Sequence, residues 1–311
     1  MNIILLTFFF VILFFILGYG ADLVIFNLKE IGKALGLKIF FLGIILGIIT
    51  SLPELAVGFN AVVKDIPGIS AGNLFGGIIV LLSLILGLNI VFNREITTDG
   101  KIFNLFSFFV LIILAILLSL DGVIGVVDGV ILMLVYLFSV WFLYKKNKPN
   151  INYSVEMISQ KKIYQEIFFI AVGLVLIIVS SGLIIRLAED ILEFFKVSPF
   201  LIGIIFFSLG TNLPEITVSF KAWRNKNTEL SISNLLGSGA ANIFILGLLA
   251  SIQKINIEIN KEFYLLIFTV ALILALFAIF YRTGKRFSFF EGLVFLGVYI
   301  LFILSHFIFF I

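Results

Sequence analysis

Two glutamates, Glu54 and Glu215, lie inside long apolar stretches of the sequence, each directly after a proline. A proline inside a helix lacks the N–H that the helix needs, and its ring crowds the carbonyl group four residues earlier, so the helix breaks or kinks there. An acidic side chain in the middle of a membrane is costly and marks a functional site by default. Carboxylate oxygens and freed carbonyl oxygens together suit a hard cation. The two Leu-Pro-Glu sequences therefore predict cation binding.

Further oxygen-bearing side chains flank both glutamates. Pro214 is expected to free the carbonyl group of Gly210, because that carbonyl loses its usual donor. Asn242 is an amide among apolar neighbours that needs a polar partner, and Ser238 lies one turn earlier on the same helix face. We interpret both side chains as candidate ligands that offer oxygens toward the two carboxylates. The candidates within one turn of the prolines are Thr50, Ser51, Thr211 and Asn212.

The elements that position these residues form two copies. Three short motifs of the first half recur in the same order in the second half. Each half contains an odd number of apolar spans, so the second half must insert upside down relative to the first. Inverted repeats with interrupted helices are typical of secondary transporters, which bind their substrate at the repeat interface. The matching stretches are Thr50–Leu55 with Thr211–Ile216, Asn73–Gly77 with Asn234–Ser238, and Asp128–Gly129 with Glu291–Gly292.

The composition indicates a lipid environment. Of the 311 residues, 62% are hydrophobic and 13% are charged, whereas a soluble domain has about 25% charged residues. Long apolar runs favour helices over a β-barrel. A membrane span needs about 20 apolar residues, and ten candidates are present. They are residues 3–20, 38–60, 68–92, 102–120, 123–144, 164–187, 198–221, 229–252, 262–281 and 288–310.

We therefore predict an all-α membrane protein with ten transmembrane helices. They form two inverted five-helix repeats, residues 1–144 and 164–311, in which prolines break helices 2 and 7. A polar linker, residues 145–163, joins the repeats.

The positive charges predict the orientation of the chain, because Lys and Arg are enriched in cytoplasmic loops. All but five of the 21 Lys and Arg residues lie in the loops after spans 1, 3, 5, 7 and 9. The sequence thus predicts a multi-pass protein of the cell membrane, with the linker in the cytoplasm and both termini outside. The five exceptions are Lys64, Arg186, Lys196, Lys254 and Lys261.

Other classes of function have little support. The sequence has no Cys, which excludes disulfides and thiolate metal sites. It has neither an H-E-x-x-H nor a G-x-S-x-G motif, so we expect no enzyme and no cofactor. The basic residues sit in short loops between apolar spans, so we expect no nucleic acid. We expect inorganic cations and membrane lipids as partners, and a monomer is compatible with the sequence.

Three charged or titratable residues outside the Leu-Pro-Glu sequences have simpler interpretations. Asp128 and Glu291 each precede a glycine near the start of a span. A carboxylate there is favoured by the helix dipole, so we interpret both as helix caps. His306, in the last span, is interpreted as a packed side chain.

With these motifs the sequence resembles the cation/calcium antiporter family, specifically the sodium/calcium exchanger type. Thr50–Glu54 and Gly210–Glu215 are similar to that family's G-T-S-L-P-E signature. Gly72–Gly76 and Asn234–Asn242 are similar to its G-N-x-x-G-S-N-x-x-N signature. The resemblance implies a four-cornered site that holds calcium and sodium alternately. Its corners are the two Leu-Pro-Glu glutamates and the last Asn or Asp of the second signature in each half.

The first half departs from that pattern more than the second. Leu81 occupies the fourth corner, and Gly77 and Ile78 stand where the resemblance implies a serine and an amide. In the second half, Gly239 replaces an amide and Asn212 replaces a serine. Calcium takes about six to eight oxygens, so we expect weaker calcium binding or a changed choice of ion. The corners that are present are Glu54, Glu215 and Asn242.

Together these inferences predict a secondary active cation antiporter that exchanges calcium for sodium by alternating access at a midplane site. Two facing glutamates repel each other, and one divalent cation, two monovalent cations or two protons neutralise them. These occupants compete for one site, which is the basis of exchange. A calcium/proton antiporter is the nearest alternative, followed by a non-transporting relative with a decayed site. A channel is disfavoured, because nothing resembles a selectivity filter.

Overall fold

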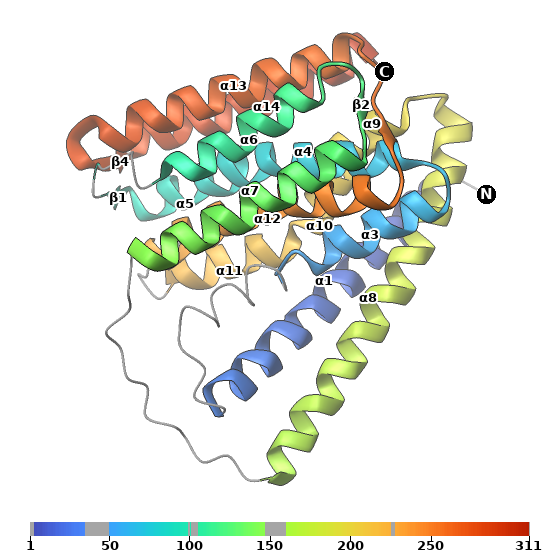
Figure 1. The fold of residues 1–311 in the computed structure, drawn as a ribbon, viewed down its shortest axis with the longest axis horizontal. Helices are drawn as coiled ribbons and strands as arrows, with labels where there is room; N and C mark the ends of the chain where they lie inside the picture. The colour runs from blue at the N-terminus through green and yellow to red at the C-terminus, as the bar shows by residue number, and fades with distance from the viewer. Residues whose placement is uncertain are drawn as a thin grey trace.

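The computed structural model describes residues 3–34, 50–98, 100, 105–146, 160–224 and 228–310. Helices dominate this part of the chain, and two short β ribbons join their loops (Figure 1). The helical elements before the central linker are α1 (Ile3–Ala34), α3 (Leu52–Val63), α4 (Pro67–Ile79), the π-helix η1 (Val80–Ile85), α5 (Leu86–Asn93), α6 (Phe106–Leu118) and α7 (Val126–Lys146). Those after the linker are α8 (Gln160–Phe195), α9 (Pro199–Ile202), the π-helix η3 (Gly203–Phe207), α10 (Ser208–Thr211), α11 (Leu213–Arg224), α12 (Thr228–Ile252), α13 (Lys261–Arg282), the 3-10 turn η4 (Thr283–Lys285) and α14 (Phe289–Phe310).

The described helices follow the predicted apolar spans. The first part of predicted span 38–60 and most of the predicted linker, 147–159, lie outside the described residues. Within the described residues, six helical segments are long and apolar enough to cross a membrane. They are Phe8–Leu28, Pro67–Asn93, Ile163–Phe194, Asn234–Ile252, Lys261–Lys285 and Phe289–His306. The chain is therefore a mostly helical membrane protein.

Helices α1 and α8 are much longer than their predicted spans, 3–20 and 164–187. Both continue through charged residues, because Lys, Glu and Arg are good helix formers and the end of an apolar run need not end the helix. The two helices pack along each other. A Cβ added at Gly20 of α1 would lie 2.9 Å from the carbonyl oxygen of Gly173, which shows how closely the backbones approach.

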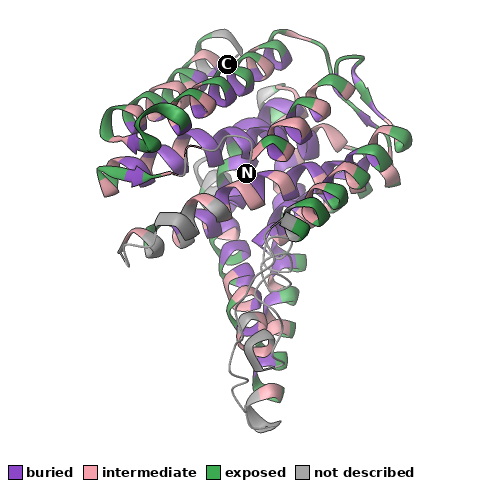
Figure 2. Cartoon of the chain, turned by 60° about the vertical axis from the view of Figure 1, so that its left-hand side comes forward, coloured by how far each residue is buried: buried purple, intermediate pink, exposed green. Residues whose placement is uncertain are grey.

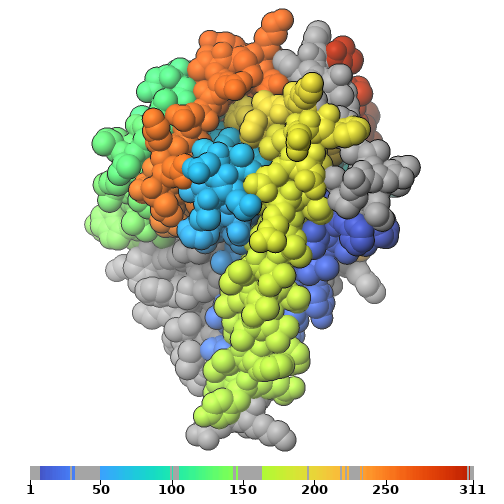
Figure 3. Space-filling model, turned by 90° about the vertical axis from the view of Figure 1, so that its right-hand side faces the viewer, coloured from blue at the N-terminus to red at the C-terminus, as the bar shows by residue number. Residues whose placement is uncertain are grey.

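The α1–α8 pair leans away from the other helices. In Figures 1 and 2 the ends of the pair near Ala34 and Gln160 stand clear of the remaining bundle. Figure 3 shows α8 along the full height of one face, between α3 and α1. The other ends of the pair contact α3, α10 and α11. The molecule thus consists of a bundle and an attached two-helix arm.

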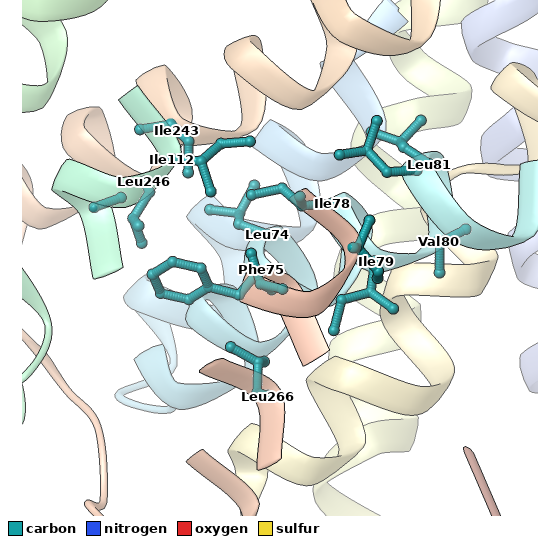
Figure 4. Packing of buried hydrophobic residues seen from close by; sticks show 14 of the residues in the cluster. Leu74, Phe75, Ile78, Ile79, Val80, Leu81, Ile112, Ile243, Leu246 and Leu266 are labelled. Carbon is teal, nitrogen blue, oxygen red and sulfur yellow. The ribbon is translucent and has the colours of Figure 1, made fainter. Parts of the chain in front are cut away.

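Two apolar cores match this division. The larger core lies in the bundle, where Leu74 and Ile78 of α4 meet Ile112 of α6 and Ile243 of α12 (Figure 4). The smaller core joins the α1–α8 pair to the bundle. At its centre the rings of Phe10 and Phe14 pack edge-on against Phe207. Buried residues concentrate in these two zones, whereas the outer helix faces are exposed (Figure 2).

The prolines interrupt the helices as predicted where the structure describes both sides. Helix α10 ends at Thr211, Asn212 adopts a non-helical turn, and α11 begins at Leu213. In the first half, Ser51 is the N-cap residue of α3, and Pro53 lies in the first turn of that helix. A proline is tolerated in a first turn because the missing N–H has no partner there anyway.

Two antiparallel ribbons are the described exceptions to the predicted all-helical fold. β1 (Glu95–Thr97) pairs with β4 (Arg286–Ser288), joining the loops after predicted spans 3 and 9. β2 (Val123–Ile124) pairs with β3 (Ile255–Asn256), joining the connection between α6 and α7 to the loop after span 8, so the first two residues of predicted span 5 are strand and not helix. Each ribbon therefore joins two loops that the charge pattern assigns to the same side of the membrane. Which side is cytoplasmic stays a prediction.

Candidate functional site

Glu54 and Glu215 lie close together in the interior of the protein. Each side chain is 1% exposed, and the two charges interact directly. Each acid lies in the first turn of its helix, α3 or α11, where the helix dipole favours a negative charge. No described residue donates a hydrogen bond to either oxygen of Glu54 or to Oε2 of Glu215. Three buried carboxylate oxygens of the pair therefore have no donor among the described residues, and a bound cation would satisfy them.

Ser238 and Thr50 link the Glu215 side of the site to the first half of the chain. The Ser238 hydroxyl donates to Oε1 of Glu215 across 3.3 Å, and it lies 3.4 Å from the hydroxyl of Thr50. Both side chains are buried. The structure thus brings three of the predicted candidates together, although Thr50 lies just before α3, Glu215 in α11 and Ser238 in α12.

Thr211 forms the corresponding contact near Glu54. Its hydroxyl lies 3.0 Å from Oδ1 of Asn73 and 3.0 Å from the carbonyl oxygen of Phe207, so its one hydrogen is shared. The Thr211 side chain also interacts with the Glu54 carboxylate. Thr211 therefore places a hydroxyl oxygen beside the acid of the opposite half.

Two amides converge on Gly77. A Cβ added at Gly77 would lie 2.6 Å from Nδ2 of Asn242 and 3.2 Å from Nδ2 of Asn212. The Asn212 amide donates to the carbonyl oxygen of Ser208 across 2.7 Å, while its Oδ1 accepts no hydrogen bond from the described residues. Neither polar atom of the Asn242 side chain has a described partner. Asn242 therefore fills the space left open by Gly77 with an uncommitted amide.

Close backbone contact aligns the helices that carry these residues. A Cβ added at Gly203 of η3 would lie 2.5 Å from the carbonyl oxygen of Ile69 in α4, and one at Gly72 would strike the carbonyl oxygen of Phe200. Only glycine permits such an approach. The contact brings Asn73, one residue after Gly72, next to Thr211, two turns after Gly203. The glycine-rich stretch of α4 thus sets the position of the site.

The Ser51 hydroxyl and the carbonyl oxygen of Gly210 were both predicted as candidate oxygens, and the structure gives each a specific local setting. Ser51 is buried at the N-cap of α3, where its carbonyl oxygen accepts the N–H of Leu55, but its hydroxyl does not cap the helix. The carbonyl oxygen of Gly210, expected to be free, accepts the N–H of Asn212. Pro214 has no N–H to donate to that carbonyl oxygen, but the N–H of Asn212 in the following turn donates to it instead.

The first-half positions Gly77, Ile78 and Leu81 contribute no side-chain oxygen. Leu81 is fully buried in the main apolar core, within the π-helix η1 (Figure 4). A Cβ added at Gly239 would lie 3.2 Å from Phe108 and 3.9 Å from Leu81, so these three residues close that side of the site with carbon atoms. The fourth corner that the resemblance implies is therefore apolar in this chain.

Three further residues belong to this region but were not predicted. Asn73 and Ser208 are buried, and each accepts a hydrogen bond from a candidate ligand. The recurrence of Asn73 as Asn234 in the repeat was a usable signal. Asp22 of α1 acts electrostatically on Glu215. It was missed because the predicted first span ended at residue 20, before this acid.

The acids interpreted as caps form the expected bonds. Oδ2 of Asp128 accepts the N–H of Gly125 across 2.9 Å, and Oε2 of Glu291 accepts the N–H of Ser288 across 2.6 Å. His306 is fully buried in α14, with Nδ1 2.8 Å from the carbonyl oxygen of Phe302. These contacts agree with structural roles for all three side chains.

Comparison with known proteins places this chain in a family. The family model described as sodium/calcium exchanger protein matches residues 5–145 and 166–308. The uncharacterized membrane protein MJ0091 of Methanocaldococcus jannaschii is 26% identical over 301 residues, which cover 94% of this chain and 96% of that protein.

Solved structures agree with the family match. The sodium-calcium exchanger NCX_Mj is 25% identical and has a TM-score of 0.66, with 97% of this chain and 99% of that chain covered. The H+/Ca2+ exchanger CAX, at 15% identity, has the same fold, with a TM-score of 0.79 over 96% of this chain and 82% of that one. The chain therefore belongs to the sodium/calcium exchanger family of cation/calcium antiporters.

Proposed function

We propose that this protein exchanges calcium for sodium across the membrane, with Glu54 and Glu215 as the charged ligands of one shared site. The observation that carries the proposal is the pair of buried carboxylates, of whose four oxygens only Oε1 of Glu215 accepts a hydrogen bond from the described residues. A pair of bare charges in a low-dielectric interior is costly, and a bound cation removes that cost. The similar protein NCX_Mj is a sodium-calcium exchanger, which supports sodium as the counter-ion.

The ligand shell is assigned to the oxygens around this pair. Thr50 and Ser238 lie on the Glu215 side, and Thr211 lies beside Glu54. Asn212 and Asn242 offer amide oxygens without described donors. Ser51 is the remaining candidate, buried in the same turn as Thr50. These oxygens approach the six to eight that calcium takes, and water supplies the rest.

Alternating access at this site requires the inverted-repeat architecture, which we propose as ten transmembrane helices with a cytoplasmic linker and both termini outside. The two ribbons support it. β1 and β3 follow equivalent helices of the two halves, and β2 and β4 precede equivalent helices. Exchanging the halves therefore converts the β1–β4 ribbon into the β3–β2 ribbon. Such a relation is what two inverted copies produce.

A calcium/proton antiporter is the second candidate. The apolar side formed by Leu81, Phe108 and Gly239 favours it, because a proton needs a carboxylate but no shell of oxygens. The fold shared with CAX is compatible with either function.

The test is calcium uptake into proteoliposomes containing the purified protein. We expect uptake when an outward sodium gradient is imposed and none with a pH gradient alone. Uptake driven only by the pH gradient would establish the second candidate. The Glu54→Gln/Glu215→Gln double variant serves as the inactive control. Uptake by that variant at the wild-type rate would remove the carboxylate pair from the mechanism, and no uptake in any gradient would indicate a non-transporting relative.

A further inference from the structure

The negative charges that a transported cation must neutralise can be counted at the site. Glu54 and Glu215 are the buried acids there, and no group of three or more His, Cys, Asp or Glu side chains is found among the described residues. Two other acids are buried elsewhere in the described chain. Glu166 lies in α8, and Glu262 accepts a hydrogen bond from Ser198 at the start of α9.

The two remaining corners of the site add no charge. Asn242 supplies a neutral amide, seated against Gly77. Leu81, at the corresponding position of the first half, is buried with Phe108 and Gly239 on the apolar side. A further cation at either corner would have to be held by neutral oxygens alone, in an interior where unpaired charge is costly.

Asp22 is a third acid near the pair, but it differs from the other two. It lies on α1 and is partly exposed, and it has a polar interaction of its own. Because it is partly exposed and already has an interaction of its own, we do not count it among the buried charges that a transported cation must neutralise. The buried charge at the site is therefore that of Glu54 and Glu215.

Resting on the proposed exchange function, we propose that the site carries a total charge of +2 in each direction, so that one divalent cation exchanges for two monovalent cations. One divalent cation or two monovalent cations neutralise the buried carboxylates equally. The occupied site then changes its access from one side of the membrane to the other without carrying net charge. A third monovalent cation would bring an unmatched positive charge into the low-dielectric interior. Transport is therefore electroneutral.

The test measures the equilibrium accumulation of calcium in proteoliposomes at a fixed sodium gradient. The membrane potential is clamped with potassium and valinomycin at zero or at 100 mV. One net charge per cycle would change the accumulation ratio about 50-fold at 100 mV, whereas electroneutral exchange leaves it unchanged. A 50-fold change in the wild-type protein would overturn the inference but leave the exchange function intact. Absence of any coupled uptake would defeat the exchange function, and this inference with it.

Asn242→Asp sharpens the test, because it adds a third acid at a site corner with almost no change in size. Three acids take up three monovalent cations but still one divalent ion, so the about 50-fold potential dependence should appear. Asn93→Asp adds the same charge at the end of α5 and should leave exchange independent of potential. An Asn242→Asp protein that exchanges without potential dependence would show that the site acids do not set the transported charge, which overturns the inference.

Asp22→Asn checks the partly exposed acid separately. We expect its exchange to stay independent of potential, like that of the wild-type protein. If instead the wild-type protein depends on potential and this variant does not, Asp22 is a third ligand and the count of two charges is wrong.

Discussion

The two halves of the chain give the site equal charge but unequal neutral ligands. Each half supplies one buried glutamate in the first turn of a helix. The second half adds Ser238 and Asn242, whereas the matching positions of the first half are Gly77 and Leu81. The carboxylate pair is thus symmetric, and its surroundings are not.

This difference separates two requirements of a cation carrier. Charge neutralisation needs both acids, because neither alone balances a divalent ion. Coordination by neutral oxygens can come mainly from one side, provided that space on the other side is filled. Here Gly77 admits the Asn242 amide from the opposite half. In the proposed site, the missing side chain at Gly77 is therefore coupled to the position of the Asn242 amide.

Substitutions in the carboxylate pair, which both halves supply, should have the largest effect. Glu54→Gln and Glu215→Gln, tested singly, should each weaken calcium binding by more than about 100-fold, since loss of an outer-shell partner alone typically costs 10- to 100-fold. The two losses should be similar. Isothermal titration with calcium measures both, and Glu189→Gln, in the exposed Lys64–Glu189 pair, is the control. A variant that retains wild-type affinity would show that the acids are not equivalent.

The unequal neutral ligands of the two halves predict that a serine introduced at Gly77 weakens calcium binding. Gly77→Ser should displace the Asn242 amide, because its Cβ would lie 2.6 Å from Nδ2. Calcium affinity should fall roughly 10- to 100-fold, the value of a lost contact to a charged or coordinated group. Asn242→Ala should have a similar effect.

A double-mutant cycle in the same titration assay distinguishes displacement from general damage. Gly77→Ser combined with Asn242→Ala should bind calcium about as well as either single variant, because both changes act on one amide. Additive losses, or tighter binding by Gly77→Ser alone, would contradict the coupling of these positions.

The smallest effect is expected at Ser238. Ser238→Ala removes the hydrogen bond to Glu215, and one such bond is worth about 1 kcal/mol, or roughly five-fold in calcium affinity. Ser70→Ala is a matched control, since Ser70 is equally buried but bonds to the carbonyl oxygen of Gly58 outside the site. If both variants lose affinity equally, Ser238 acts through stability and not as a ligand.

The helical fold was predictable because the signals were strong and local. Apolar runs marked the spans, and prolines marked the break between α10 and α11. The lengths of α1 and α8 were not predictable from the same signal, since their charged ends are helical as well. The π-helical segment around Leu81 was not predicted either, because an apolar run marks a span but not the hydrogen-bonding pattern within it.

The site residues that recur in both halves of the sequence could be predicted. Repetition singled out the glutamates and their flanking hydroxyls, and the structure places these side chains close together. Partners contributed by a single helix had no such signal. Ser208 was missed for this reason, and so was Asp22, which lies beyond the apolar part of α1.

Helix α8 has 36 residues, which corresponds to a length of about 54 Å. The hydrocarbon layer of a bilayer is only about 30 Å thick. A helix with such an excess tilts or projects from the layer, at a cost of fractions of a kcal/mol per Å of mismatch. Because α1 and α8 pack along each other and their backbones touch at Gly20 and Gly173, a tilt of α8 would carry α1 with it. The thickness of the surrounding lipid therefore helps to set the angle between the arm and the bundle.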